Sequence, residues 1–124
     1  ASTVPPTTLA PRTAFSTRLQ ADTAAGATGT AVYEVPNGSA LAISDLLLQN
    51  PGSDEGTVTL FRNDEVLFRW SLGTVFGDVV RPFVTPIQLA GGEQLRMEVS
   101  CTLVGDAAAG LCTPGIVVSG ELIG

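Results

Sequence analysis

The clearest pattern of apolar and polar positions in the chain is the strict alternation over residues 94–103. Successive side chains of a β-strand point to opposite faces, so a period of two predicts a strand with one buried face and one wet face. The apolar face of this strand carries Leu95, Met97, Val99, Cys101 and Leu103.

Seven weaker copies of this pattern run through the chain, and residues typical of turns separate them. They predict strands over residues 13–20, 30–35, 41–50, 57–62, 66–72, 79–89 and 116–123. No stretch has a convincing helical period, and turn signals recur about every 8–12 residues, as in a sandwich or barrel. The chain is therefore predicted to be all-β.

The stretch 41–50 is apolar at both parities. Leu41 and Ile43 share one parity, whereas Leu46 and Leu48 share the other. Either both faces of the strand are covered, or a β-bulge near Ser44-Asp45 switches the phase. We expect the bulge, because it leaves the charge of Asp45 within reach of water.

The strands 57–62 and 66–72 are expected to form a hairpin whose register follows from its apolar residues. A three-residue loop over 63–65 sets Val58 opposite Trp70 and Leu60 opposite Phe68. A two-residue loop slips this pairing by one position and turns the apolar set to the wrong face. The three-residue loop is therefore predicted, although it requires Glu65 to adopt the left-handed conformation that Gly or Asn prefers.

Two prolines identify an edge strand. Pro82 and Pro86 have the same parity within residues 79–89, so their missing N–H groups lie along the same side of the strand. A central strand needs that side for its hydrogen-bond ladder, and an edge strand does not. Phe83, Ile87 and Leu89 are the expected inward residues.

Eight strands of this kind predict an antiparallel jelly-roll β-sandwich, in which two four-stranded sheets lie face to face. In that topology the fourth and fifth strands are neighbours in one sheet, and the sixth lies at an edge of the other. An immunoglobulin-like sandwich is the alternative. It lacks support because Trp70 precedes both cysteines, whereas that fold has its Trp between them.

Residues 1–12 (ASTVPPTTLAPR) differ from the rest in composition, and we expect two parts: an extended N-terminal arm over 1–12 and the sandwich over 13–124. Proline removes backbone donors and favours extended backbone. The segment is either a linker or an arm that lies on a neighbouring subunit. The candidate contact residues of such an arm are Val4, Pro5, Pro6, Leu9 and Pro11.

A length of 124 residues indicates one such domain, with no apolar run long enough for a transmembrane helix. The sequence starts at Ala1 and not at Met. We expect this start to reflect either a removed secretion signal or a trimmed initiator Met, and the sequence does not distinguish the two.

Charge and two missing residue types exclude several functions. Six Arg against twelve acidic residues give a net charge of −6, which disfavours nucleic acid and anionic membranes as partners. The absence of His excludes Ser-His-Asp or Cys-His catalysis and His-ligated zinc or haem. The absence of Lys excludes Schiff-base chemistry and a P-loop.

The two cysteines, Cys101 and Cys112, flank a loop of small residues. A disulfide between them would close a loop of about a dozen residues and contribute about 3 kcal/mol. It would also indicate an oxidising compartment. The alternative is two separate thiols, with Cys101 in the core and Cys112 in a loop.

Carboxylates are the remaining candidates for catalytic side chains. Asp54-Glu55 and Asp64-Glu65 are adjacent pairs, while Asp78 and Asp106 stand in predicted loops. A glycosidase needs two carboxylates that face each other across a cleft, whereas adjacent loop carboxylates are usually solvated. Calcium in these loops would be chemically reasonable, but their spacing matches no known calcium loop. We therefore predict no catalytic residue, no cofactor and no metal site.

Aromatic residues could mark a surface contact. Strand parity assigns Phe15, Phe68, Trp70 and Phe83 inward, which leaves Tyr33, Phe61 and Phe76 as possible surface aromatics. Phe61 falls on the outward face of its hairpin strand. An exposed Phe there would indicate a contact patch, and partial cover by a loop is the alternative.

Four segments carry a resemblance at the level of architecture. Residues 35–51 (VPNGSALAISDLLLQNP), 56–68 (GTVTLFRNDEVLF), 83–101 (FVTPIQLAGGEQLRMEVSC) and 112–122 (CTPGIVVSGEL) resemble small secreted jelly-roll proteins of high-GC bacteria. The combination of arm and jelly roll is also similar to bacterial fibre subunits, such as spore appendage proteins, and to virion decoration proteins. Unlike the spore appendage pattern, the arm here has no cysteine.

Together these features predict a non-enzymatic structural subunit. We expect it to self-assemble in an extracellular filament or on a cell or virion surface, with copies of itself as partners. The alternative is a small carbohydrate- or surface-binding module in which the arm is only a linker. A glycan partner would then be expected near Tyr33 or Phe61.

Overall fold

The computed structural model describes residues 11–74, 78–105, 108 and 110–124. Their strands are β1 (Arg12–Gln20), β2 (Thr28–Glu34), β3 (Ala40–Gln49), β4 (Glu55–Arg62), β5 (Glu65–Ser71), β6 (Asp78–Ala90), β7 (Gln94–Leu103) and β8 (Gly115–Ile123). A single 3₁₀ turn, η1 (Leu72–Thr74), follows β5. The eight predicted strands are thus confirmed, with ends that differ by at most two residues.

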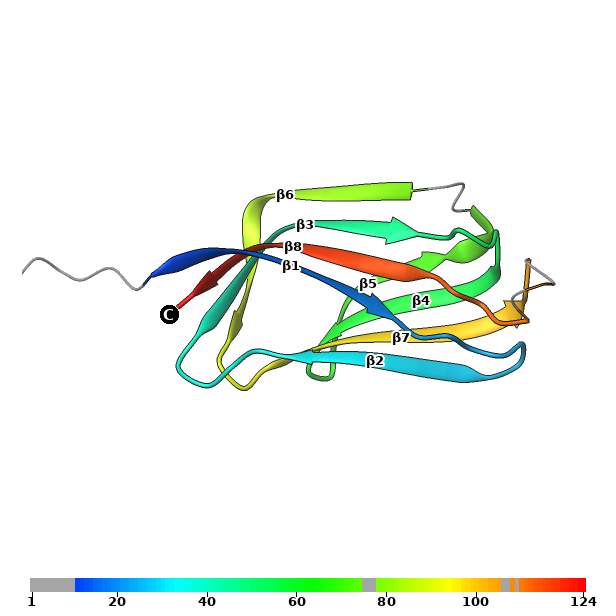
Figure 1. Ribbon diagram of the computed structural model, residues 1–124, viewed down its shortest axis with the longest axis horizontal. Helices are drawn as coiled ribbons and strands as arrows, with labels where there is room; N and C mark the ends of the chain where they lie inside the picture. The colour runs from blue at the N-terminus through cyan, green and yellow to red at the C-terminus, as the bar shows by residue number, and fades with distance from the viewer. Residues whose placement is uncertain (1–10, 75–77, 106–107, 109) are drawn as a thin grey trace, which may run out of the picture.

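The strands form two antiparallel sheets that stack face to face (Figure 1). One sheet has the order β1-β8-β3-β6 and the other the order β2-β7-β4-β5. This is the jelly-roll order that the sequence predicts, with β4 beside β5 and β6 at an edge. The position of β6 also confirms the interpretation of Pro82 and Pro86.

The core lies between the sheets and is built from the side chains of each strand that point inward. Leu95, Met97 and Val99 of β7 are completely buried, as their alternation predicts. Leu103 was expected on the same face but is 55% exposed. The reason is a shift in the β4–β7 ladder, where Gly56 pairs with Cys101 and Glu55 pairs with Leu103, so parity changes at the end of β7.

The predicted bulge in β3 is confirmed. The register shifts between Ile43 and Asp45 in both ladders of β3. As a result Leu41 and Ile43 share the buried face with Leu46 and Leu48. Gly120 of β8 pairs with Ile43 at this point, and a Cβ atom there would collide with the carbonyl oxygen of Ala42. The close approach of the two strands therefore requires glycine.

The bulge also bends β6. Ile43 pairs with Ile87, but Asp45 pairs with Pro82, so residues 83–86 of β6 face a single residue of β3. Figure 1 shows β6 turning sharply along its length. Phe83 and Ile87 nevertheless pack against the core, as predicted.

The predicted register of the hairpin is confirmed, but the predicted loop length is wrong. Val58 pairs with Trp70, and Leu60 pairs with Phe68. However, Phe61 pairs with Val66 and Arg62 with Glu65, so the loop has two residues and the additional residue lies within β5. Asn63, with φ 51°, takes the left-handed conformation in place of Glu65. Asn tolerates that region far better than a long side chain such as Glu does.

Candidate assembly site

The predicted arm joins the sandwich at a fixed root. The N–H of Gly124 donates a hydrogen bond to the carbonyl oxygen of Pro11, at 2.9 Å. Arg12 is already the first residue of β1 and pairs with Ile123, and its guanidinium lies 3.0 Å from Glu121. Pro11 is the candidate arm residue that the structure describes, and Val4, Pro5, Pro6 and Leu9 lie outside the described residues. The root is thus held by backbone pairing, and the exposed ion pair adds little to it.

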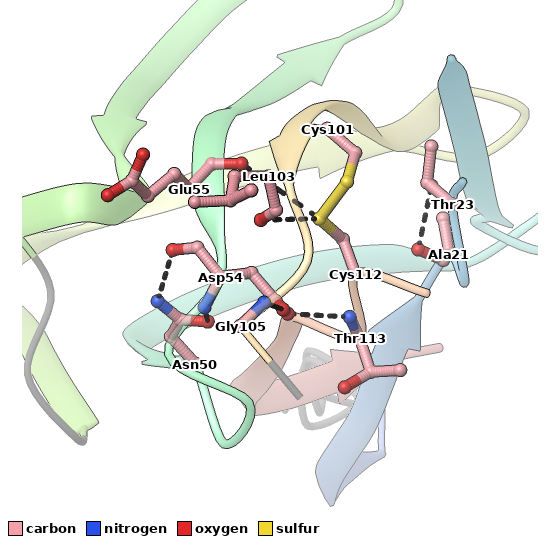
Figure 2. Close-up of a disulfide and its surroundings, with 10 residues drawn as sticks. All are labelled: Ala21, Thr23, Asn50, Asp54, Glu55, Cys101, Leu103, Gly105, Cys112 and Thr113. Carbon is pink, nitrogen blue, oxygen red and sulfur yellow. Dashed lines mark hydrogen bonds between the residues drawn. A yellow bond between two sulfur atoms is a disulfide. The ribbon is translucent and has the colours of Figure 1, made fainter. Parts of the chain in front are cut away.

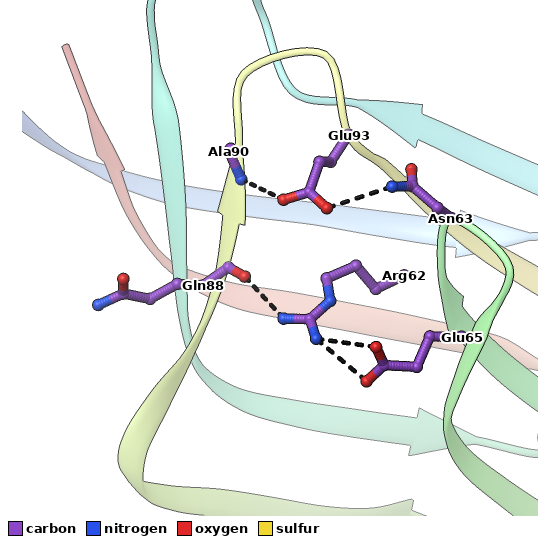
Figure 3. A network of polar contacts seen from close by, with 6 residues as sticks. All are labelled: Arg62, Asn63, Glu65, Gln88, Ala90 and Glu93. Carbon is purple, nitrogen blue, oxygen red and sulfur yellow. Dashed lines mark hydrogen bonds and ion pairs between the residues drawn. The ribbon is translucent and has the colours of Figure 1, made fainter.

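At the end of the sandwich where β1 starts, the β4–β5 and β6–β7 turns are joined by a polar network (Figure 3). The Glu93 carboxylate accepts hydrogen bonds from the N–H of Ala90, at 2.6 Å, and from the amide of Asn63, at 3.2 Å. The backbone of Gln94 donates to Asn63 Oδ1 and accepts from the Asn63 N–H. Asn63 therefore holds the two turns together as well as shaping its own.

Arg62 extends this network along β6. Its guanidinium donates to the carbonyl oxygen of Gln88, at 3.1 Å, and to both carboxylate oxygens of Glu65, at 3.0 and 3.1 Å (Figure 3). Glu65 is largely exposed, so its charge is paired but still solvated. This agrees with the expectation that the Asp64-Glu65 pair belongs to a turn and not to a cleft.

The predicted disulfide between Cys101 and Cys112 is present, with Cα atoms 6.0 Å apart (Figure 2). It links the end of β7 to the segment before β8, and both cysteines are buried. Backbone hydrogen bonds in both directions between Thr23 and Cys112 attach this segment to the β1–β2 connection. The disulfide therefore closes the end of the sandwich opposite to the arm.

Asp54 is a structural residue that the sequence interpretation missed. It was expected to be a solvated loop charge, and this is wrong, because the residue is only 1% exposed. Its carboxylate accepts the N–H of Gly105 at 2.8 Å and the N–H of Thr113 at 2.9 Å (Figure 2). Asn50 binds the backbone N–H and carbonyl of Asp54 through its side-chain amide. Asp54 thus fastens both ends of the disulfide loop.

The three candidate surface aromatics do not share one environment. Tyr33 is half-buried against the core, with its ring 5.0 Å from that of Phe15. Phe61 lies on the outer face as predicted, but the Arg96 guanidinium covers it at 4.3 Å from the ring centroid. Phe76 lies outside the described residues. The structure therefore does not bring the three together, and the cover on Phe61 comes from a neighbouring strand and not from a loop.

Two hollows open on the outer faces of the sheets. One, of about 290 Å³, lies over the paired ends of β3 and β6 close to the root of the arm. The other, of about 230 Å³, lies on the opposite sheet, and polar side chains line it: Thr57, Thr59, Arg69, Glu98 and Ser100.

Reactive groups are scattered over the described part of the chain. Within residues 11–74, 78–105, 108 and 110–124, no three Cys, Asp or Glu side chains gather closely enough to hold a metal ion. Over the same residues, no helix is long and apolar enough to cross a membrane. Asp106, one of the carboxylates considered for calcium, lies outside them.

No protein-family model matches the chain, and no curated protein matches it either. Among solved structures, the chain is similar to the cryo-EM structure of the giant freshwater prawn Macrobrachium rosenbergii extra small virus (XSV) VLP. The match has 11% sequence identity and a TM-score of 0.45, and it covers 98% of this chain and 85% of that chain. This similarity is too weak to indicate a function for the chain.

Proposed function

We propose that this protein is a non-enzymatic structural subunit that assembles with copies of itself, its N-terminal arm docking on a neighbouring subunit. The observation that carries the proposal is the fixed root of the arm. Pro11 is hydrogen-bonded to Gly124, and Arg12 begins a strand of the sandwich, so the Pro- and Thr-rich residues before them start from a defined place and direction.

The edge strands support the same proposal. Val80 and Val84 on β6 and Val66 on β5 are exposed, and β5 and β6 are each an edge of their sheet. Two of these valines, Val80 and Val84, lie on one edge strand and offer a second subunit apolar surface to cover. The disulfide supports a place outside the reducing cytosol, either extracellular, on a cell surface or on a virion.

The test compares the full chain with a chain that lacks residues 1–10. The deletion should keep Pro11 and Arg12, because removing residues 1–12 would also remove the first pair of the β1–β8 ladder. Sedimentation equilibrium over a hundredfold range of concentration should give multimers for the full chain and monomers for the deletion. Far-ultraviolet circular dichroism and thermal melting check that both are folded. A full chain that stays monomeric throughout, or a folded deletion that assembles unchanged, would overturn the proposal.

A carbohydrate- or surface-binding module is the second candidate, and the polar hollow on the outer face of β4, β5 and β7 favours it. Arg69 donates to the Thr59 hydroxyl at 3.3 Å, and Glu98 is the cross-strand neighbour of Thr59. Hydroxyl and charged groups of this kind bind sugar hydroxyls well. A glycan array with the native chain and with Arg69→Ala, Glu98→Gln and Phe61→Ala tests it. Saturable binding that these changes abolish would favour this candidate over assembly.

A further inference from the structure

The hollow beside the arm root, called here the alanine hollow, has a distinctive lining. It is formed by two paired strand ends, one residue of the β6–β7 turn and one residue of β8. The lining residues are Ala40, Leu41, Ala42, Gln88, Leu89, Ala90, Glu93 and Ile123. Its volume of about 290 Å³ is roughly twice that of a 150 Å³ cavity able to hold benzene, so it has space for two small apolar side chains.

The hollow exists because short side chains form its floor. Leu41 and Leu89 point inward and are fully buried, so their neighbours on β3 and β6 point outward. Ala40 pairs with Ala90, and Ala42 pairs with Gln88. Three alanines therefore face outward where most sheets carry longer side chains. Ala90 is exposed and Ala40 half-buried, whereas Ala42 is buried.

The walls are held in place by contacts within the subunit. Glu93 is fixed by the N–H of Ala90 and the amide of Asn63, and the carbonyl of Gln88 accepts a hydrogen bond from Arg62 (Figure 3). The carboxylate of Glu93 is therefore already bonded to two donors. The hollow is preformed and offers an apolar floor, so it suits an uncharged apolar segment.

The root of the arm lies close to this hollow. Ile123 pairs with Arg12 on one side and with Ala40 on the other, so only β8 separates the root from the floor. Neighbouring strands are about 4.8 Å apart, which puts the two about 10 Å apart. The ten residues before Pro11 span at most about 36 Å when extended, and they carry no charged side chain.

We propose that the alanine hollow binds the Val4-Pro5-Pro6 segment of the arm of a second copy of this chain, an inference that rests on the proposed assembly through the arm. Val and Pro side chains are short and apolar, as the hollow requires. The arm of the same copy is disfavoured because β1 runs away from this end of the sandwich (Figure 1). A segment that continues the line of β1 beyond Pro11 leads away from the sandwich, and prolines favour the extended backbone that keeps this line.

The prolines of β6 also favour side-chain packing in the hollow over the addition of a strand to the edge of β6. A strand that joined the free edge of β6 would need backbone donors there, and Pro82 and Pro86 have none. Prolines on edge strands are a common way to prevent such pairing. The hollow lies beyond both prolines, over residues 88–90 of β6.

A pair of matched variants of the full chain tests the docking site. Ala90→Gln fills the hollow from an exposed position of β6. Ala14→Gln is its control, because Ala14 is an exposed alanine on the same outer face, at β1, outside the hollow. Sedimentation equilibrium should show that Ala90→Gln raises the concentration of half-assembly at least tenfold. Ala14→Gln should change it less than twofold, and equal thermal melting verifies that both variants are folded.

A photo-crosslinking experiment locates the arm directly. The full chain carries p-benzoylphenylalanine in place of Val4, and equal amounts of ¹⁴N- and ¹⁵N-labelled protein are mixed before irradiation. Mass spectrometry should find mixed-isotope crosslinks to residues 40–42 or 88–93. Crosslinks within one copy, crosslinks to β5 or to the first half of β6, or an unaffected Ala90→Gln variant would overturn the docking site while assembly itself persists. Failure of the unmodified chain to assemble would instead overturn the proposed function.

Discussion

Replacing Asp54 should be among the most destabilising single changes in this protein, although the residue lies in a loop. In Asp54→Ala, the N–H groups of Gly105 and Thr113 lose the carboxylate that accepts them at 2.8 and 2.9 Å. An unsatisfied buried donor costs about 1–3 kcal/mol. Because Gly105 is exposed and Thr113 is partly exposed, water can replace part of each bond. We therefore take about 1.5 kcal/mol for each, or about 3 kcal/mol in total.

This loss is measurable by urea unfolding followed by circular dichroism. For a domain of this size, about 3 kcal/mol lowers Tm by about 12 °C. Asp54→Asn keeps one acceptor oxygen but turns an NH₂ group toward the other N–H, so it should lose about half as much. Asp78→Ala, at an exposed carboxylate, is the control and should change stability by less than about 0.5 kcal/mol. If Asp54→Ala is as stable as that control, the carboxylate does not fasten the loop and the reasoning fails.

Three further changes probe other parts of the fold. Replacing Cys101 and Cys112 by Ala should lower the free energy of unfolding by about 3 kcal/mol, measured in urea; a change below about 1 kcal/mol would contradict the loop-closure estimate. Gly120→Ala should cost about 2 kcal/mol because its Cβ would meet the carbonyl of Ala42, and Ser119→Ala beside it should cost far less. Glu65→Gln should cost less than about 1 kcal/mol in thermal melting, since the Glu65 carboxylate is largely exposed, and a large loss would show that its pair with Arg62 does more than join a turn.

Most of the fold could be predicted from the sequence because each strand buries one face. Alternation locates the strands, and the conflict of parities between Ile43 and Leu46 predicts the bulge that both ladders of β3 contain. The same reasoning misses a bulge that the pattern of apolar and polar residues does not mark. The additional residue within β5 and the shift before Leu103 do not change which residues are apolar, so no pattern marks them.

The candidate site was harder to predict because its residues meet only in three dimensions. Asp54 binds N–H groups that are 51 and 59 residues away, and neither Gly105 nor Thr113 is distinctive in sequence. The alanine hollow depends on Ala40 and Ala90 being paired across β3 and β6, which requires the correct register of an edge strand. The arm, by contrast, was evident from composition alone, since prolines and threonines need no tertiary context to exclude a helix.

The location of the hollow limits the kind of assembly that the arm can build. The root of the arm and the alanine hollow lie at the same end of the sandwich, about 10 Å apart. With the arm and its acceptor at one end, two copies that face each other by this end can exchange arms reciprocally, which gives a closed twofold assembly. Such an exchange engages both arms and closes the assembly, and the two weak contacts reinforce each other. We therefore expect the mass in sedimentation equilibrium to level off at two chains of 12.7 kDa each as concentration rises. A mass that keeps growing would show that the acceptor lies elsewhere on the subunit.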